Sequence, residues 1–397
     1  MNAARWVVIG TLLLAASLAL AGDAKLVEDK VLDIGGAAEG PSPRPAVIAA
    51  QLSPDGKYLL YAKAEMAEDK GDGRTIGDPG PTTRRSNRQY RLFLRDLATG
   101  KDTAIPAPAW SWDDPLKMML SLNVFSADGK KIVLGIGATA TEDGVFDFRK
   151  GTMKPALYDI ASGKLDTLPI EAKIVLPLFH RNGKDLLLIV APNLKDPPKE
   201  LTVAKADKYE PSKVAVGGVA FDMCPTADVV PVVEFPERGE AGKRSSYKLR
   251  LFDLSAGKVV AELPVGERNT KLDDCPPRWT PDGRFLYYVD VADDKPTGEG
   301  PARRKQITRI WDRKEGKEAG IVDKAIPVGP GRKDGEMVLL SDETKPRLVV
   351  HDAATGMTTD LLSPEGRITP LFAGGGRIVY AKAVGEGKVE YHLAKIE

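Results

Sequence analysis

From residue 47 onward, short apolar runs alternate with clusters of turn-forming and charged residues. Three such runs are YLLY at 58–61, IVL at 132–134 and FLYY at 285–288. They are about five residues long and rich in aromatic and β-branched side chains, which favours β-strands. No stretch beyond the N-terminal segment has the long, capped apolar period of a helix. The pattern therefore predicts an all-β chain of many short strands.

Tight turns recur at two fixed places between these strands. The first carries an Asp–Gly pair, and its clearest copies are Asp55 and Gly56, Asp128 and Gly129, and Asp282 and Gly283. The second follows a strand that ends in aspartate and reaches a glycine four residues later; these aspartates are Asp96, Asp159, Asp253, Asp312 and Asp352. Aspartate supplies a local acceptor and glycine a positive φ, as tight hairpins require. Because they recur in every copy, we interpret these residues as structural.

The two turns divide the chain into units of four antiparallel strands, repeated every 40 to 70 residues or so, which is typical of propeller blades. Seven first halves lie near positions 55, 128, 182, 228, 282, 334 and 375. The last unit ends in its third strand, and residues 25–34 are expected to supply the missing fourth. The prediction is a single seven-bladed β-propeller over residues 22–397. A β-sandwich or two smaller β domains are the alternative.

The Ser-Pro-Asp-Gly turn at 53–56 and the Asp-x-x-Thr-Gly turn at 96–100 carry a resemblance to a known family. Together they resemble the WD40-like repeat of TolB-type propellers, and the repeat covers nearly all of residues 22–397. The resemblance implies a propeller fold. It leaves function open, because relatives include periplasmic scaffolds and the propeller halves of serine peptidases.

The N-terminus has the pattern of a secretory signal peptide. Arg5 is followed by an apolar stretch over 6–20, and Ala19-Leu20-Ala21 gives the small-x-small cleavage pattern. We predict a signal peptide at 1–21 and a periplasmic or secreted protein without a membrane span after cleavage. An uncleaved anchor helix is the alternative.

Charge and cysteine content narrow the classes of partner. The chain has 57 Lys and Arg against 56 Asp and Glu, so no overall field favours nucleic acid. Its only two cysteines, Cys224 and Cys275, form a candidate disulfide in an oxidising compartment, with two free thiols as the alternative.

The connections between the second and third strands of several units are long. Three of them carry acidic residues first and basic residues just before the third strand. The basic residues are Arg84, Arg85, Arg88, Lys243, Arg244, Arg303, Arg304 and Lys305. Since these connections leave one face of a propeller, we predict that the clusters form a shallow site for an anionic ligand or an acidic protein surface. Solvated charges that pair locally are the alternative.

The sequence shows no catalytic or metal-binding constellation. His180, His351 and His392 fall at unrelated repeat positions, no G-x-S-x-G motif is present, and the Asp72-Gly73 run lacks the order of a calcium loop. The leading hypothesis is a monomeric, non-catalytic propeller without cofactor that binds another envelope or secreted protein through its long-loop face. A small-molecule or glycan binder that uses the same face or the central channel is the first alternative, and a propeller lyase with an unrecognised site is the second.

Overall fold

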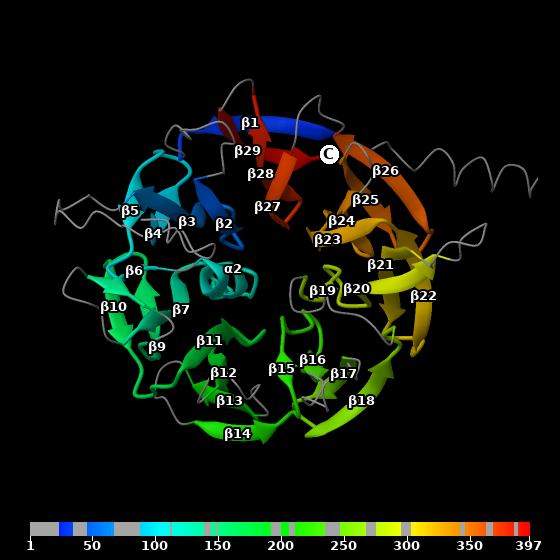
Figure 1. Ribbon diagram of the computed structural model, residues 1–397, viewed down its shortest axis with the longest axis horizontal. Helices are drawn as coiled ribbons and strands as arrows, with labels where there is room; N and C mark the ends of the chain where they lie inside the picture. Colours follow the sequence, from blue (N-terminus) through cyan, green and yellow to red (C-terminus); the bar gives the residue numbers. More distant parts are fainter. Residues whose placement is uncertain are drawn as a thin grey trace, which may run out of the picture.

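A computed structural model describes residues 24–34, 46–66, 88–111, 113–138, 144–147, 150–191, 200–205, 211–234, 247–266, 275–294, 303–341, 346–362, 368–384 and 388–397. Within them, seven sheets stand around a common axis as the blades of a propeller (Figure 1). The predicted all-β, seven-bladed fold is confirmed. No helix in the described part of the chain is long and apolar enough to cross a bilayer.

Each blade runs outward from the axis. The innermost strands are β2 (Val47–Leu52), β11 (Ile174–Phe179), β15 (Val219–Ala220), β19 (Arg278–Trp279), β23 (Ala325–Pro330) and β27 (Ile368–Gly374). The second strands are β3 (Tyr58–Met66), β7 (Lys131–Gly137), β12 (Asp185–Ala191), β16 (Val229–Glu234), β20 (Phe285–Asp294), β24 (Glu336–Ser341) and β28 (Arg377–Ala383). The apolar runs of the sequence lie in these second strands, which are buried between neighbouring blades.

The outer half of each blade is more polar. The third strands are β4 (Arg88–Asp96), β9 (Met153–Asp159), β13 (Glu200–Lys205), β17 (Lys248–Asp253), β21 (Arg303–Asp312), β25 (Leu348–Asp352) and β29 (Val389–Ile396). The outermost strands are β5 (Asp102–Ala104), β10 (Lys164–Thr167), β14 (Ser212–Ala215), β18 (Lys258–Leu263), β22 (Lys317–Asp323), β26 (Met357–Leu362) and β1 (Leu26–Leu32). Their solvent-facing positions explain why the outermost strands had the weakest apolar signal in the sequence.

The ring closes through the first strand of the chain. β1 pairs antiparallel with β29, with Leu26 opposite Ile396, and lies beside it in Figure 1. Leu32 and Ile34 are buried against the last and first blades. The predicted closure by residues 25–34 is therefore confirmed, and it pairs an edge of β29 that would otherwise be open.

The second blade departs from the predicted four strands. Its sheet contains β7, β9 and β10 only, and the innermost place is taken by helix α2 (Asp114–Leu120) and the segment after it. Two short parallel strands, β6 (Ala109–Trp110) and β8 (Val145–Phe146), attach to the first blade. Trp110 and Phe146 pack edge to face with their ring centroids 4.9 Å apart, and both are buried. In Figure 1, α2 lies inside the ring of strands.

The two kinds of tight turn lie together at one end of the axis, which we call the tight-turn face. Leu97 N in the outer turn of the first blade donates to Lys57 O in its inner turn at 2.9 Å. The fifth blade repeats this bond from Arg313 N to Arg284 O at 2.8 Å. The second-to-third-strand connections therefore leave the opposite end, which we call the long-loop face.

Neighbouring blades are also joined by buried polar contacts. Tyr287 of β20 and His351 of β25 share a hydrogen bond between Tyr287 Oη and His351 Nδ1 at 2.8 Å, and both side chains are buried. Burial lowers the pKa of His351, which nearby Asp352 opposes. The folded protein therefore holds this imidazole neutral at a pH where the unfolded chain would begin to protonate it.

We expect this contact to make stability sensitive to mild acid. Below the ordinary histidine pKa of about 6.5, the unfolded chain binds a proton that folded His351 resists, so the free energy of unfolding falls as pH decreases. Urea denaturation at pH 7.5 and 5.5 measures the fall. The fall should be smaller in His351→Leu but persist in Tyr287→Phe, which keeps the titrating ring. An unchanged fall in His351→Leu would exclude this histidine as its source.

Candidate functional site

Most of the basic residues predicted to bind a partner lie where the structure gives no side chain. Arg84, Arg85, Lys243 and Arg244 lie outside the described residues. Arg88 begins β4, and Arg303 and Arg304 begin β21, but their side chains are not described. The sequence had assigned 303–305 to a loop, whereas the β20–β21 hairpin extends through these residues.

Local pairing accounts for part of the predicted cluster. Lys305 Nζ lies 2.8 Å from Asp323 Oδ2 on the neighbouring outer strand. The register of β20 and β21 places Arg303 opposite Asp294 and Arg304 opposite Asp293. Acidic and basic residues opposite each other on paired strands reduce the net charge that this hairpin offers to a partner.

The two cysteines do not form a disulfide in this structure. Cys224 is buried and Cys275 half-buried, and neither sulfur is bonded to the other. Cys224 Sγ lies 3.4 Å from Gly283 O, in the inner turn of the next blade. The thiol therefore packs at the contact between the fourth and fifth blades.

The Asp–Gly turns have the geometry that their sequence implies. Gly56, Gly129 and Gly283 have φ values of +68°, +68° and +63°. Asp55 Oδ1 accepts hydrogen bonds from Ser53 Oγ at 2.7 Å and Lys57 N at 3.1 Å. Asp128 and Asp282 form the same two contacts in their own blades. These bonds fix the hairpins, and in the outer turns the backbone N–H of Thr99 and Ala98 lowers the pKa of Asp96 in the same way.

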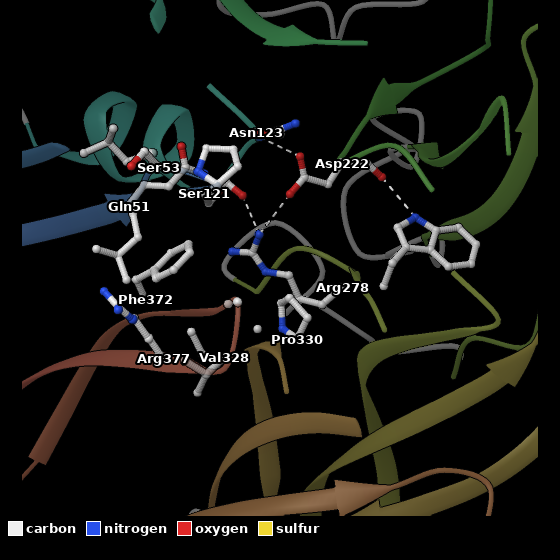
Figure 2. Close-up of a pocket in the computed structure, with 18 of the residues that line it drawn as sticks. Gln51, Ser53, Ser121, Asn123, Asp222, Arg278, Val328, Pro330, Phe372 and Arg377 are labelled. Atoms are coloured by element: carbon white, nitrogen blue, oxygen red, sulfur yellow. Dashed lines mark hydrogen bonds and ion pairs between the residues drawn. The ribbon is translucent and has the colours of Figure 1, made fainter. Parts of the chain in front are cut away.

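The described residues enclose a cavity of about 510 Å³ on the axis, toward the tight-turn face. Its walls come from the innermost strands, from the turns that follow them and from the end of α2 (Figure 2). One side is apolar and includes Val328, Pro330, Leu371 and Phe372. The volume lies within the range of about 300–1,000 Å³ that is typical of small-ligand pockets.

The segment after α2 is held at the axis by polar contacts to the first blade. Gln51 Nε2 donates to Leu122 O at 2.7 Å, and Val124 N donates to Gln51 Oε1 at 3.3 Å. Gln51 is nearly buried, so both ends of its amide are used inside the protein. These bonds attach α2 to the inner strand of a neighbouring blade and replace the strand pairing that the second blade lacks.

A second set of contacts joins the same segment to the fourth and fifth blades. Asn123 N donates to Asp222 Oδ1 at 2.7 Å, and Arg278 Nη1 lies 3.3 Å from Asp222 Oδ2 (Figure 2). Arg278 Nη1 also donates to the carbonyl oxygen of Ser121, and Trp279 Nε1 donates to Asp222 O at 3.1 Å. Burial raises the pKa of Asp222, while Arg278 opposes the rise. The ion pair thus lies in the cavity wall and joins three parts of the ring.

Arg278 keeps N–H donors for which no described residue is an acceptor. Its Nε is buried without a hydrogen-bond partner, and Nη2 bonds to no described residue. Elsewhere in the cavity wall, Nη1 of Arg377 in the seventh blade donates to the backbone oxygen of Gly56 in the first blade at 3.2 Å. The cavity therefore has one apolar side and guanidinium groups elsewhere in its wall.

The histidines do not converge on this cavity. His180 of the third blade lies 3.6 Å from Asp228 of the fourth. His351 pairs with Tyr287, and His392 stacks on Tyr380 with ring centroids 4.9 Å apart. No group of three or more His, Cys, Asp or Glu side chains in the described ranges is placed to hold a metal ion. Within those ranges, the axial cavity is therefore the best-defined candidate site.

Comparison with known proteins shows the fold. No family model and no curated protein matches the chain. Among solved structures, the propeller domain of the Trilobed protease from Pyrococcus furiosus matches with a TM-score of 0.54 and 12% identity, over 94% of this chain and 96% of that one. Prolyl oligopeptidase B from Galerina marginata matches with a TM-score of 0.51 and 13% identity, over 85% of this chain and 46% of that one.

TolB from Acinetobacter baumannii also matches, over 94% of this chain and 98% of that one, but with a TM-score of 0.38 and 13% identity. At these identities the first two likenesses show a β-propeller and do not show what it binds. The TolB-type family that the turn motifs suggested stays a prediction.

The central channel was an alternative site from the sequence, but its polar wall residues Gln51 and Arg278 were not predicted, although one signal was available. Gln51 and Arg278 each stand four residues before the aspartate of an Asp–Gly turn. The equivalent position before Asp128 is Val124. This repeat position belongs to the innermost strand of a blade. Polar side chains there indicate that polar groups line the propeller axis.

Proposed function

We propose that the protein is an exported, non-catalytic binding propeller that holds part of a partner protein in its axial cavity at the tight-turn face. The observation that carries this proposal is the cavity of about 510 Å³, which has one apolar side and the guanidinium group of Arg278 in its wall. Concave apolar sites with a few convergent polar groups are the usual form of ligand pockets. The predicted signal peptide at 1–21 supports a periplasmic or secreted location.

A second proposal keeps the partner on the long-loop face, as the sequence suggested. The strand topology supports it. In the antiparallel pairs β3–β4, β16–β17 and β20–β21, the end of the second strand and the start of the third lie at that face. The acidic residues opposite Arg303 and Arg304 count against a free basic surface there. We therefore rank this face second.

One capture experiment separates the two proposals. The chain over 22–397 serves as bait for cross-linking in envelope extract of its source. Leu371→Trp fills the cavity, and we expect it to lower recovery of the captured partner at least about tenfold, the effect of losing roughly 1.4 kcal/mol of binding free energy. A second variant changes four arginines of the long-loop face to Ser and should leave recovery of the partner unchanged. These are Arg84, Arg85, Arg303 and Arg304.

The matched control is Val260→Trp, which adds the same side chain at an exposed position of β18. Thermal melts confirm that each variant is folded. Full recovery with Leu371→Trp and loss with the fourfold Ser variant would overturn the axial proposal and support the long-loop face.

A further inference from the structure

Most charged side chains around the axial cavity form an ion pair with a neighbouring residue. The basic residues in its wall are Lys117, Arg181, Arg278 and Arg377, and the acidic ones are Asp55 and Asp222. Lys117 pairs with Asp113 at 2.6 Å and Arg181 with Asp228 at 2.6 Å, both acids outside the wall. Asp55 pairs with Lys57 at 3.1 Å.

Arg377 is the exception among the charged wall residues that the structure describes. Within the described ranges, its side chain forms one hydrogen bond, to the backbone oxygen of Gly56, and no ion pair. It is half-buried, so water screens its charge less than that of a fully exposed arginine. A half-buried guanidinium with a single neutral acceptor keeps unused N–H donors and an uncompensated positive charge.

Arg278 adds donors from the opposite part of the wall. Asp222 and the Ser121 carbonyl both accept from Nη1. No described residue accepts a hydrogen bond from Nη2. Arg278, Phe372 and Arg377 surround the same cavity in Figure 2. Leu371, Phe372 and Val328 belong to the same wall as these two guanidinium groups, which can only donate.

We propose that this cavity binds a carboxylate attached to an apolar body, with Arg377 and Nη2 of Arg278 as the donors. Guanidinium groups form charge-assisted bonds to carboxylates, which are about twice as strong as neutral ones. The apolar side accommodates the body of the ligand. This inference rests on the proposed use of the cavity and specifies its ligand class. The carboxylate belongs either to the C-terminus of a polypeptide or to a small organic acid.

Three probes test the chemistry on the chain over 22–397. They are N-acetyl-Ala-Val-Phe with a free carboxylate, the same peptide as its C-terminal amide, and 3-phenylpropionate. Trp279 lies in the cavity wall, so its signal in fluorotryptophan-labelled protein reports binding, and Trp279→Phe assigns that signal. We expect the free acid to bind at least about tenfold more tightly than the amide, as for the loss of one charge-assisted bond.

Variants assign the preference to the proposed donor. Arg377→Gln should abolish the preference for the acid, and Arg377→Lys should retain most of it. Arg347→Gln is the control, because Arg347 pairs with Asp360 at 2.8 Å near the long-loop end of β25. A thermal melt checks the fold of each variant. If 3-phenylpropionate binds as tightly as the peptide acid, the ligand is a small acid; if it binds more weakly, the ligand is a polypeptide end.

Three results would overturn the inference: equal binding of acid and amide, a preference that survives Arg377→Gln, or no shift of the Trp279 signal by either acid at about 10 mM. These results differ from failure of the proposed function. If Leu371→Trp loses the captured partner while Arg377→Gln keeps it, the cavity is the binding site and its ligand is not a carboxylate.

Discussion

Replacing Leu32 by alanine is expected to lower the free energy of unfolding by about 2–5 kcal/mol, the range for truncating a buried leucine. Leu32 is 3% exposed at the end of β1 and packs between the last and first blades. The matched control is Val31→Ala in the same strand, where the side chain is 53% exposed. That change should alter stability by less than about 0.5 kcal/mol.

Deleting residues 24–34 extends the same prediction. The deletion removes three buried side chains, Ala24, Leu32 and Ile34, and every backbone bond between β1 and β29. The expected loss is comparable to the total stability of a typical domain, about 5–15 kcal/mol. The exposed edge of β29 should also promote self-association. Urea denaturation and size-exclusion chromatography measure both effects, and a stable monomer without these residues would contradict closure by β1.

The repeated parts of the fold could be predicted because turn chemistry is local. An Asp–Gly pair between two apolar runs specifies a hairpin whatever the distant parts of the chain do. Seven copies, together with an incomplete last unit, were sufficient to predict the number of blades and the role of residues 25–34. Gly56 and Gly283 adopt the positive φ that this reasoning requires.

The second blade could not be predicted by extending the repeat. Phe125 and the turn at 126–130 match the other units, but α2 replaces the inner strand that should precede them. A helix start signal was present, with Pro115 in the first turn and Leu116, Met119 and Leu120 spaced to bury one face. The helix is only seven residues long, and its position depends on Gln51 and Asp222 from other blades.

The candidate site depends on the same long-range contacts. Ser121 and Arg278 are far apart in the sequence and meet only when the ring has closed. The predicted basic residues share a local charge pattern, and most of them lie outside the described side chains. Local sequence therefore locates the turns and loops, whereas the shape and charge of the axis emerge from tertiary structure.

Arg278→Leu is expected to lower the free energy of unfolding by about 2–4 kcal/mol. Removing one partner of a fully buried pair costs about 3–5 kcal/mol, and the loss here should be smaller because the side chains of Arg278 and Asp222 remain 18% and 23% exposed. The control is Arg347→Leu, whose pair with Asp360 is more exposed, and it should cost less than about 1 kcal/mol.

Two further measurements identify the uncompensated Asp222 carboxylate as the cause of that loss. Adding Asp222→Asn to Arg278→Leu should recover part of the stability, because the buried charge is removed. The pKa of Asp222 is already raised by burial and rises further without Arg278, so the folded variant takes up a proton more readily than the unfolded chain. The loss should therefore be smaller at pH 5 than at pH 7.5.

Since Ser121 and Asn123 hold α2 through this pair, hydrogen exchange over 116–124 should accelerate more than in the Arg347→Leu control. Equal exchange in the two variants would mean that the pair does not anchor α2 at the axis.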